Sequence, residues 1–178
     1  LGNTEEVHNQ TFFVDNKGPR VFKDIGEPQH NNAHGNFIRI FTPIWINATD
    51  LEEGCTSGVK EIHYVINGEE HIETGDKVKF NFTENCSHTI EFWAVDNLGN
   101  EGTHITQVHY VDEEKPVTVT EYIPSFYPKD GRNWISNRTI KRITAIDKGC
   151  NVGGAGVEML EWKVVNTTAN PDVVITGI

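Results

Sequence analysis

The sequence predicts an all-β protein made of tandem repeats of about 97 residues. Short stretches of alternating apolar and polar residues follow one another along the chain, and none has a sustained helical spacing. The opening of the chain also returns later, because residues 1–19 and 98–116 agree at seven positions where chance predicts about one. The shared residues in the first copy are Leu1, Gly2, Asn3, Gln10, Val14, Asp15 and Pro19.

This repeat predicts three segments. We expect residues 1–16 to be the closing strand of a preceding repeat, residues 17–114 to be one complete repeat, and residues 115–178 to be the start of the next, incomplete repeat. A short polar run ending in proline separates the segments, and proline cannot continue a strand ladder. We interpret the chain as part of a longer array; donation of a strand between identical subunits is the alternative.

The complete repeat is expected to hold about seven short strands. Turn signals recur roughly every 8 to 12 residues, which is typical of an immunoglobulin-like β-sandwich. Residues 28–36 are expected to form a loop, and residues 38–48 one strand with isoleucines on its buried face. Asn67-Gly68 predicts a tight hairpin. The later strands are expected over residues 59–66, 77–83, 89–95 and 104–111.

Composition excludes some classes of protein. The formal net charge of −11 argues against a nucleic-acid partner, since phosphates require an excess of lysine and arginine. The longest apolar runs are only a few residues, so no membrane span is expected. We also find no metalloprotease, nucleophile-elbow or phosphate-loop motif, and we therefore predict no enzymatic activity.

Acceptor motifs for N-linked glycans are in excess. Six are present where chance predicts about two. Either they are accidental in a chain rich in asparagine and threonine, or the protein is secreted and glycosylated, which we prefer. The acceptor residues are Asn9, Asn47, Asn81, Asn85, Asn137 and Asn166.

Three cysteines leave one without a partner. We predict a disulfide between Cys55 and Cys86, which lie in the same repeat. Cys150 is the repeat counterpart of Cys55, so its partner is expected beyond residue 178. A free thiol or an interchain bond at Cys150 is the alternative.

Acidic side chains gather near the expected repeat boundaries and in turns. Hard cations bind several converging oxygens, so these residues are candidate calcium ligands. The alternative is that aspartate and asparagine favour turns through hydrogen bonds to their own backbone. No other cofactor is expected. The candidate ligands are Asp15, Asp50, Asp96, Asp112, Glu113 and Glu114.

Two sequence patterns resemble a known family. One is Ser57-Gly58-Val59 followed by Ile62 and Tyr64, and the other is Ile90-x-Phe92-x-Ala94-x-Asp96-Asn97-x-Gly99-Asn100. Together with Val-Asp-x-x-x-Pro linkers they resemble the immunoglobulin-like repeats of prokaryotic, especially archaeal, surface and secreted proteins. The resemblance implies a multi-repeat extracellular protein without shared catalytic residues. The cysteines and the long 28–36 loop depart from the minimal pattern.

From these observations we expect a structural repeat of an extracellular glycosylated assembly, such as a surface layer, filament or adhesin stalk. Its partners would be neighbouring repeats or identical subunits. The alternative is an accessory carbohydrate- or calcium-binding module of a secreted hydrolase. Trp45 and Trp93 point outward from their expected strands and are the candidate sugar-stacking residues.

Overall fold

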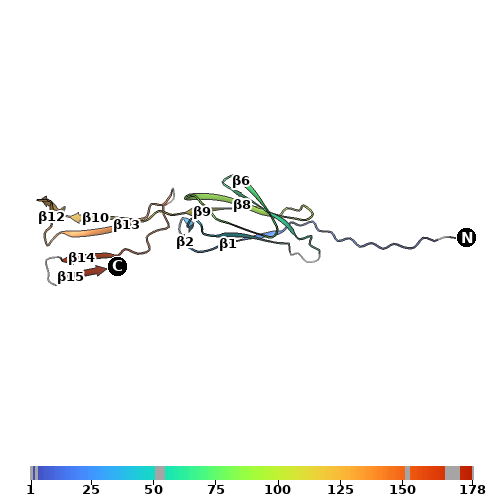
Figure 1. Ribbon diagram of the computed structural model, residues 1–178, viewed down its shortest axis with the longest axis horizontal. Coiled ribbons are helices and arrows are strands. Elements are labelled where there is room, and N and C mark those ends of the chain that lie inside the picture. The colour runs from blue at the N-terminus through green and yellow to red at the C-terminus, as the bar shows by residue number, and fades with distance from the viewer. Residues whose placement is uncertain (1, 3, 51–54, 151–152, 167–172, 178) are drawn as a thin grey trace.

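The computed structural model describes all residues except 1, 3, 51–54, 151–152, 167–172 and 178. The molecule is elongated and all-β, with an extended N-terminal segment, a central body and thinner C-terminal hairpins (Figure 1). Among the described residues no helix is present, and hence none that could cross a membrane.

Nine strands lie among the described residues between 20 and 111. They are β1 (Arg20–Ile25), β2 (Gln29–Asn32), β3 (Gly35–Ile38), β4 (Ile44–Thr49), β5 (Val59–Ile66), β6 (Glu69–Thr74), β7 (Lys77–Phe80), β8 (Cys86–Asp96) and β9 (Ile105–Val111). They form one sheet in the order β1-β4-β7 and a second in the order β2-β3-β9-β8-β5-β6. All neighbours are antiparallel except β3 and β9.

Two hydrophobic clusters lie between the two sheets, as in a β-sandwich, and the larger one draws on both sheets. Val21, Ile46 and Val78 come from the first sheet and pack with Ile62 and Phe92 from the second. The side chains that the period-two pattern predicts to face inward on β5 and β8 are largely buried. The predicted hairpin at residues 67–68 is also confirmed, and both of its residues have positive φ.

Two predictions between residues 28 and 48 are wrong. The expected loop over 28–36 contains the β2–β3 hairpin, whose polar residues at the sheet edge give no apolar alternation to recognise. The expected strand over 38–48 is interrupted, because β3 pairs in one sheet and β4 in the other. Thr42 fixes the crossing: its Oγ1 accepts a hydrogen bond from the Arg39 N–H and donates one to the Pro28 carbonyl.

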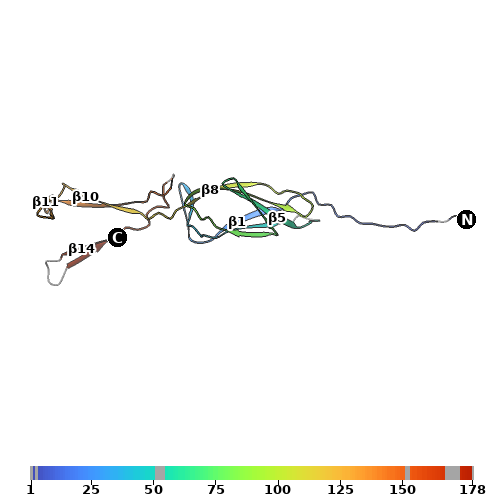
Figure 2. The same ribbon diagram turned by 45° about the horizontal axis from the view of Figure 1, so that its top comes forward.

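In the described part of the chain after β9, six strands follow in three separate pairs: β10 (Val117–Ile123) with β13 (Ile140–Ile146), β11 (Tyr127–Lys129) with β12 (Arg132–Trp134), and β14 (Trp162–Asn166) with β15 (Val173–Gly177). These lie beyond the sandwich in both views (Figure 2). Arg20 faces Thr49, and 97 residues later Val117 faces Ile146. The β2–β3 register likewise recurs in β11–β12.

The N-terminal segment is extended over residues 4–19 and belongs to no strand. It was expected to be a closing strand, yet among the described residues nothing pairs with it as a ladder. Its apolar side chains at Val7, Phe12 and Phe13 are exposed. Leu1 and Asn3 of the opening motif lie outside the described residues.

Candidate functional site

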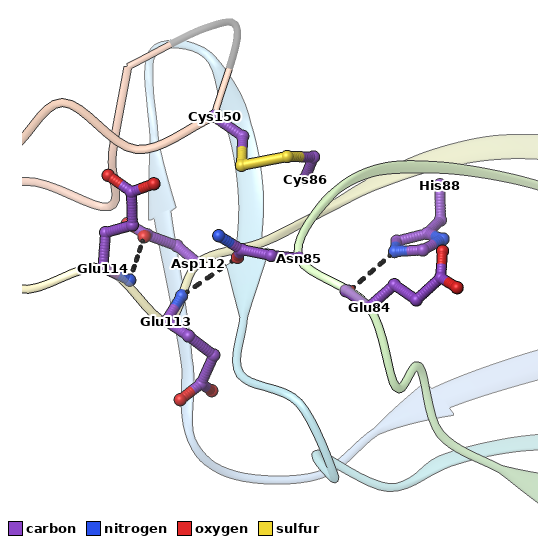
Figure 3. The surroundings of a disulfide bond; sticks show 8 residues. All are labelled: Glu84, Asn85, Cys86, His88, Asp112, Glu113, Glu114 and Cys150. Atoms are coloured by element: carbon purple, nitrogen blue, oxygen red, sulfur yellow. Dashed lines mark hydrogen bonds between the residues drawn. A yellow bond between two sulfur atoms is a disulfide. The ribbon is translucent and has the colours of Figure 1, made fainter.

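A disulfide joins the sandwich to the C-terminal hairpins. Cys86, the first residue of β8, bonds to Cys150 in the loop between β13 and β14, with a Cα–Cα distance of 4.8 Å (Figure 3). We call this region, together with the linker Asp112–Pro116, the junction. The bond spans 64 residues of chain and fixes the loop that carries Cys150 against the end of the sandwich.

The predicted Cys55–Cys86 disulfide is therefore wrong, and so is the expectation that Cys150 pairs beyond residue 178. Cys55 is a free cysteine. It lies shortly before Val59, which pairs with Asp96 at the far end of β8 from Cys86. Ten residue steps along a strand span about 33 Å, whereas a disulfide requires Cα atoms within about 7 Å. The strand direction separates the two cysteines.

Hydrogen bonds hold the loop after β13 at the junction. Asp112 Oδ2 accepts the Ala155 N–H at 2.7 Å, and Asp147 Oδ2 accepts the Gly156 N–H at 2.8 Å. The side-chain amide of Asn32 donates to the carbonyls of Gly154 and Ala155, at 3.4 and 3.3 Å. The loop is thus bonded to the linker through Asp112 and to the β2–β3 hairpin through Asn32, whereas the Asp147 bond lies within the loop itself.

The linker itself is fixed to the sandwich. Asn85 Oδ1 accepts the Glu113 N–H at 3.1 Å, beside the disulfide (Figure 3). The Glu113 carboxylate accepts two hydrogen bonds from the Arg39 guanidinium and one from the Ile40 N–H. The Arg39 hydrogen bonds hold the pKa of Glu113 below its ordinary value, although partial burial opposes them. An open cleft of about 390 Å³ remains between this linker and β2–β3.

At the opposite end of the sandwich three carboxylates converge. Oxygens of Asp15, Asp50 and Asp96 lie within 4.8 Å of one another. We call this group the acidic cluster. Asp15 Oδ2 accepts the Ser57 N–H at 2.7 Å and Asp50 Oδ2 accepts the Gly58 N–H at 2.8 Å. The side chain of Asp50 is buried, so these bonds fix the loop before β5.

Asp96 is the most enclosed member of the acidic cluster, with no exposed surface. Its Oδ1 accepts the N–H groups of Leu98 and Asn100, and its Oδ2 accepts the Asn100 side-chain amide at 2.7 Å. Burial acts to raise the pKa of Asp96, but the Asn100 hydrogen bonds, with help from Leu98, outweigh it and lower the pKa. The carboxylate therefore stays ionised and organises the turn after β8.

The two ends of the sandwich use the same hydrogen bonds. Asp15 to Ser57 corresponds to Asp112 to Ala155, with shifts of 97 and 98 residues. The bond from the Gly58 N–H to Asp50 likewise recurs 97 to 98 residues later at the junction. Sequence reasoning identified Asp15, Asp50 and Asp112 as candidate ligands but missed that their carboxylates bind backbone N–H groups.

The predicted calcium ligands thus divide into two groups. Asp15, Asp50 and Asp96 come together in the acidic cluster, while the other three lie at the junction. There Glu113 is paired with Arg39, and the Glu114 N–H donates to Asp112 Oδ1 at 3.0 Å. In both groups, aspartate carboxylates accept hydrogen bonds from backbone N–H groups. The three carboxylates of the acidic cluster converge, and converging carboxylate oxygens are a donor set that suits a hard cation.

Trp93 does not offer an open sugar-stacking surface. It faces outward from the core as predicted, but its ring lies between the rings of His63 and His104, at centroid distances of 5.0 and 4.0 Å. Its exposed fraction is 9%. Trp45, the other candidate, has the Lys79 ammonium over its ring at 5.4 Å.

The glycan acceptors are placed in several different environments. Asn9, Asn81 and Asn137 are exposed, and Asn47 and Asn85 are partly buried. Asn47 donates a hydrogen bond to Asp24, and Asn85 lies beside the disulfide. The Asn166 motif extends into residues outside those described. Compared with known proteins, the chain matches no family model and has no significant match to a curated protein or a solved structure.

Proposed function

We propose that the chain is a non-enzymatic structural segment of an extracellular, glycosylated assembly, such as a surface layer, filament or adhesin stalk. Its units are tandem immunoglobulin-like β-sandwich repeats. The observation that carries the proposal is the recurrence, about 97 residues apart, of two strand registers and two carboxylate-to-backbone bonds. In this reading residues 17–114 form one repeat, 1–16 close a preceding one and 115–178 begin the next.

The strand order supports the immunoglobulin-like assignment. Along the second sheet the last strand, β9, neighbours β8, which neighbours β5, while β1, β4 and β7 form the opposing sheet. The chain crosses between sheets from β4 to β5 and from β7 to β8, as in Greek-key sandwiches. The parallel β3–β9 pair places an early strand of the unit beside its last strand.

The junction supports a mechanical role. The disulfide, the Ala155 N–H bond to Asp112 and the Asn32 bonds to Gly154 and Ala155 hold consecutive units at a defined spacing. Tension applied along the chain passes from Cys86 to Cys150 directly, so the residues between them, including the linker, are bypassed. Reduction of the disulfide would return these 64 residues, which span roughly 230 Å when unfolded and fully extended, to the path of the tension.

Extracellular placement is supported by the disulfide, which persists in oxidising compartments, and by the six acceptor motifs. The test uses cells that make the protein. An antibody against residues 1–178 should label intact cells or the medium, and chemical deglycosylation should lower the intact mass. Exclusive labelling of permeabilised cells, with no change in mass, would overturn the proposal.

We propose a calcium ion as the ligand of the acidic cluster. Calcium binding there is compatible with the structural role and also with the alternative function, a calcium-binding module of a secreted hydrolase. Two of the three carboxylates are buried, and oxygens of all three lie within 4.8 Å of one another. Hard cations favour such converging oxygens. The carbohydrate alternative is not supported, because Trp93 is covered by two histidines.

Calcium titration tests this ligand. Saturation at about 100 times the dissociation constant should stabilise the fold by about 2.7 kcal/mol and raise the unfolding temperature. The Asp50→Asn variant should lose that response, whereas Glu69→Gln, at an exposed site on β6, should keep it. An unchanged melting temperature in the parent chain would dismiss calcium and leave the structural proposal standing.

A further inference from the structure

We propose that Cys55 is the attachment point for another copy of this repeat. Cys55 would form a disulfide with the cysteine that stands in the partner copy at the position of Cys86. This bond would be the equivalent of the Cys86–Cys150 disulfide. The inference rests on the proposed tandem array and adds its partner and its covalent link. Each junction would then carry one disulfide between consecutive sandwiches and none within a sandwich.

The surroundings of Cys55 match those of the bonded Cys150. Cys55 lies between Asp50 and the Ser57–Gly58 backbone groups that bind the acids. Cys150 lies between Asp147 and the corresponding groups of Ala155 and Gly156. The loop that presents a cysteine is therefore held by the same two hydrogen bonds at both ends of the sandwich. At one end it carries a disulfide, and at the other a partly exposed free thiol.

The N-terminal segment shows which structure would deliver the partner cysteine. Residues 8–14 correspond to β9 at the 97-residue offset. In the sandwich His109 and Val111 of β9 are 3% and 1% exposed, whereas their counterparts Phe12 and Val14 are 74% and 78% exposed. Burial of such side chains is worth about 1.5 to 3 kcal/mol each. Residues 8–14 therefore have the pattern of a closing strand whose sandwich is another copy.

Strand pairing then brings the two sulfurs together. Within the sandwich, β8 pairs with β9 so that Cys86 lies opposite Val111, one residue before Asp112. A partner that pairs its own β8 with residues 8–14 places its cysteine opposite Val14, one residue before Asp15. Because Asp15 bonds to the Ser57 N–H, this partner cysteine faces the loop of Cys55 as Cys86 faces that of Cys150.

The bond requires an oxidant. Two thiols each lose a proton, one Sγ–Sγ bond forms, and two electrons pass to the oxidant. A small disulfide such as oxidised glutathione accepts the two electrons and two protons and becomes two thiols, so the exchange balances. The oxidising setting of the proposed function favours this bond.

A fusion protein can supply the proposed partner copy. Residues 17–97 joined directly before residue 1 rebuild a complete repeat, because residues 1–16 follow in the place of 98–113. The added copy carries Cys55→Ser, which leaves its Cys86 as the only added thiol. After oxidation with oxidised glutathione, free thiols should fall from one per chain in the parent to none in the fusion. Peptide mapping should join Cys55 to the added Cys86, and the existing Cys86–Cys150 bond should persist.

The matched control is the same fusion with Cys86→Ser in the added copy, which should retain one Cys55 thiol. Hydrogen exchange at Phe12 and Val14 supplies a second readout and should slow by about a hundredfold or more once the strand pairs. If residues 8–14 become protected while Cys55 still reacts with alkylating reagent, the attachment is refuted and the array stands. If residues 8–14 also exchange rapidly, the array and the attachment fail together.

Discussion

The Cys150→Ser substitution offers the sharpest test of the junction. It removes a bond that closes 64 residues of chain. According to the chain-entropy relation, closing a loop of this size lowers the entropy of the unfolded chain by about 14 cal/mol/K, which stabilises the folded state by about 4 kcal/mol at 25 °C. This loss of stability should be largest in the C-terminal hairpins, because no hydrophobic side chain described beyond Val111 is buried. Their order depends on attachment to the sandwich.

Hydrogen exchange measures the effect locally. The Ala155 and Gly156 amides, which donate to Asp112 and Asp147, should exchange up to about a thousandfold faster in the variant, since 1.4 kcal/mol corresponds to a factor of ten. Amides in the centre of β8 should change little, because the core between the sheets does not include Cys86.

Cys55→Ser is the matched control, since it removes a free thiol and no bond. It should leave exchange at Ala155 and Gly156 unchanged in the parent chain. Unaltered exchange of these two amides in Cys150→Ser would refute the argument that loop closure stabilises the junction. An equal acceleration in both variants would assign the effect to loss of a cysteine in general.

Three further predictions concern the sandwich. Asp96→Asn should lower the free energy of unfolding by about 1 to 3 kcal/mol, because it weakens hydrogen bonds to two backbone N–H groups in a buried turn. Chemical denaturation measures this loss, with Glu69→Gln as the control. Equal free energies of unfolding in the two variants would contradict the prediction. Burial, with the nearby charge of Lys23, lowers the pKa of His109 to about 4, so the unfolded chain binds a proton that the folded one excludes. Stability should fall as pH decreases from about 6.5 towards 4, and this slope should vanish in His109→Phe. Gly68→Ala should cost about 1 kcal/mol because φ is 92° there, measurable as a lower melting temperature, although nothing lies near enough to clash.

Local pattern was a reliable guide to the strands whose faces differ in polarity. Ile90, Phe92 and Ala94 alternate with outward residues and are all buried. The β2–β3 hairpin was missed because its second strand has only Phe37 and Ile38 as buried residues, beside polar neighbours that resemble a loop. Sequence periodicity reports contrast between faces, and a polar edge strand has little contrast to report.

Which carboxylates meet in the acidic cluster, and which cysteines form the disulfide, depends on the path of the chain in space. Asp15, Asp50 and Asp96 come from three distant points in the sequence and meet because β4 and β8 end on the same side of the sandwich. Nothing in their spacing along the chain predicts that contact. The same holds for Cys86 and Cys150, which approach only because the next pair of strands begins where β8 starts.

Local alternation and internal similarity were enough to predict the all-β class, the inward-facing residues of the main strands and the 97-residue offset. Tertiary structure decided which sheet each strand joins, which cysteines bond and which carboxylates meet. A strand of eleven residues carries its two ends about 33 Å apart, so residues assigned to the same repeat can lie at opposite ends of the sandwich. Cys55 and Cys86 are separated in this way, whereas Cys86 and Cys150 are neighbours.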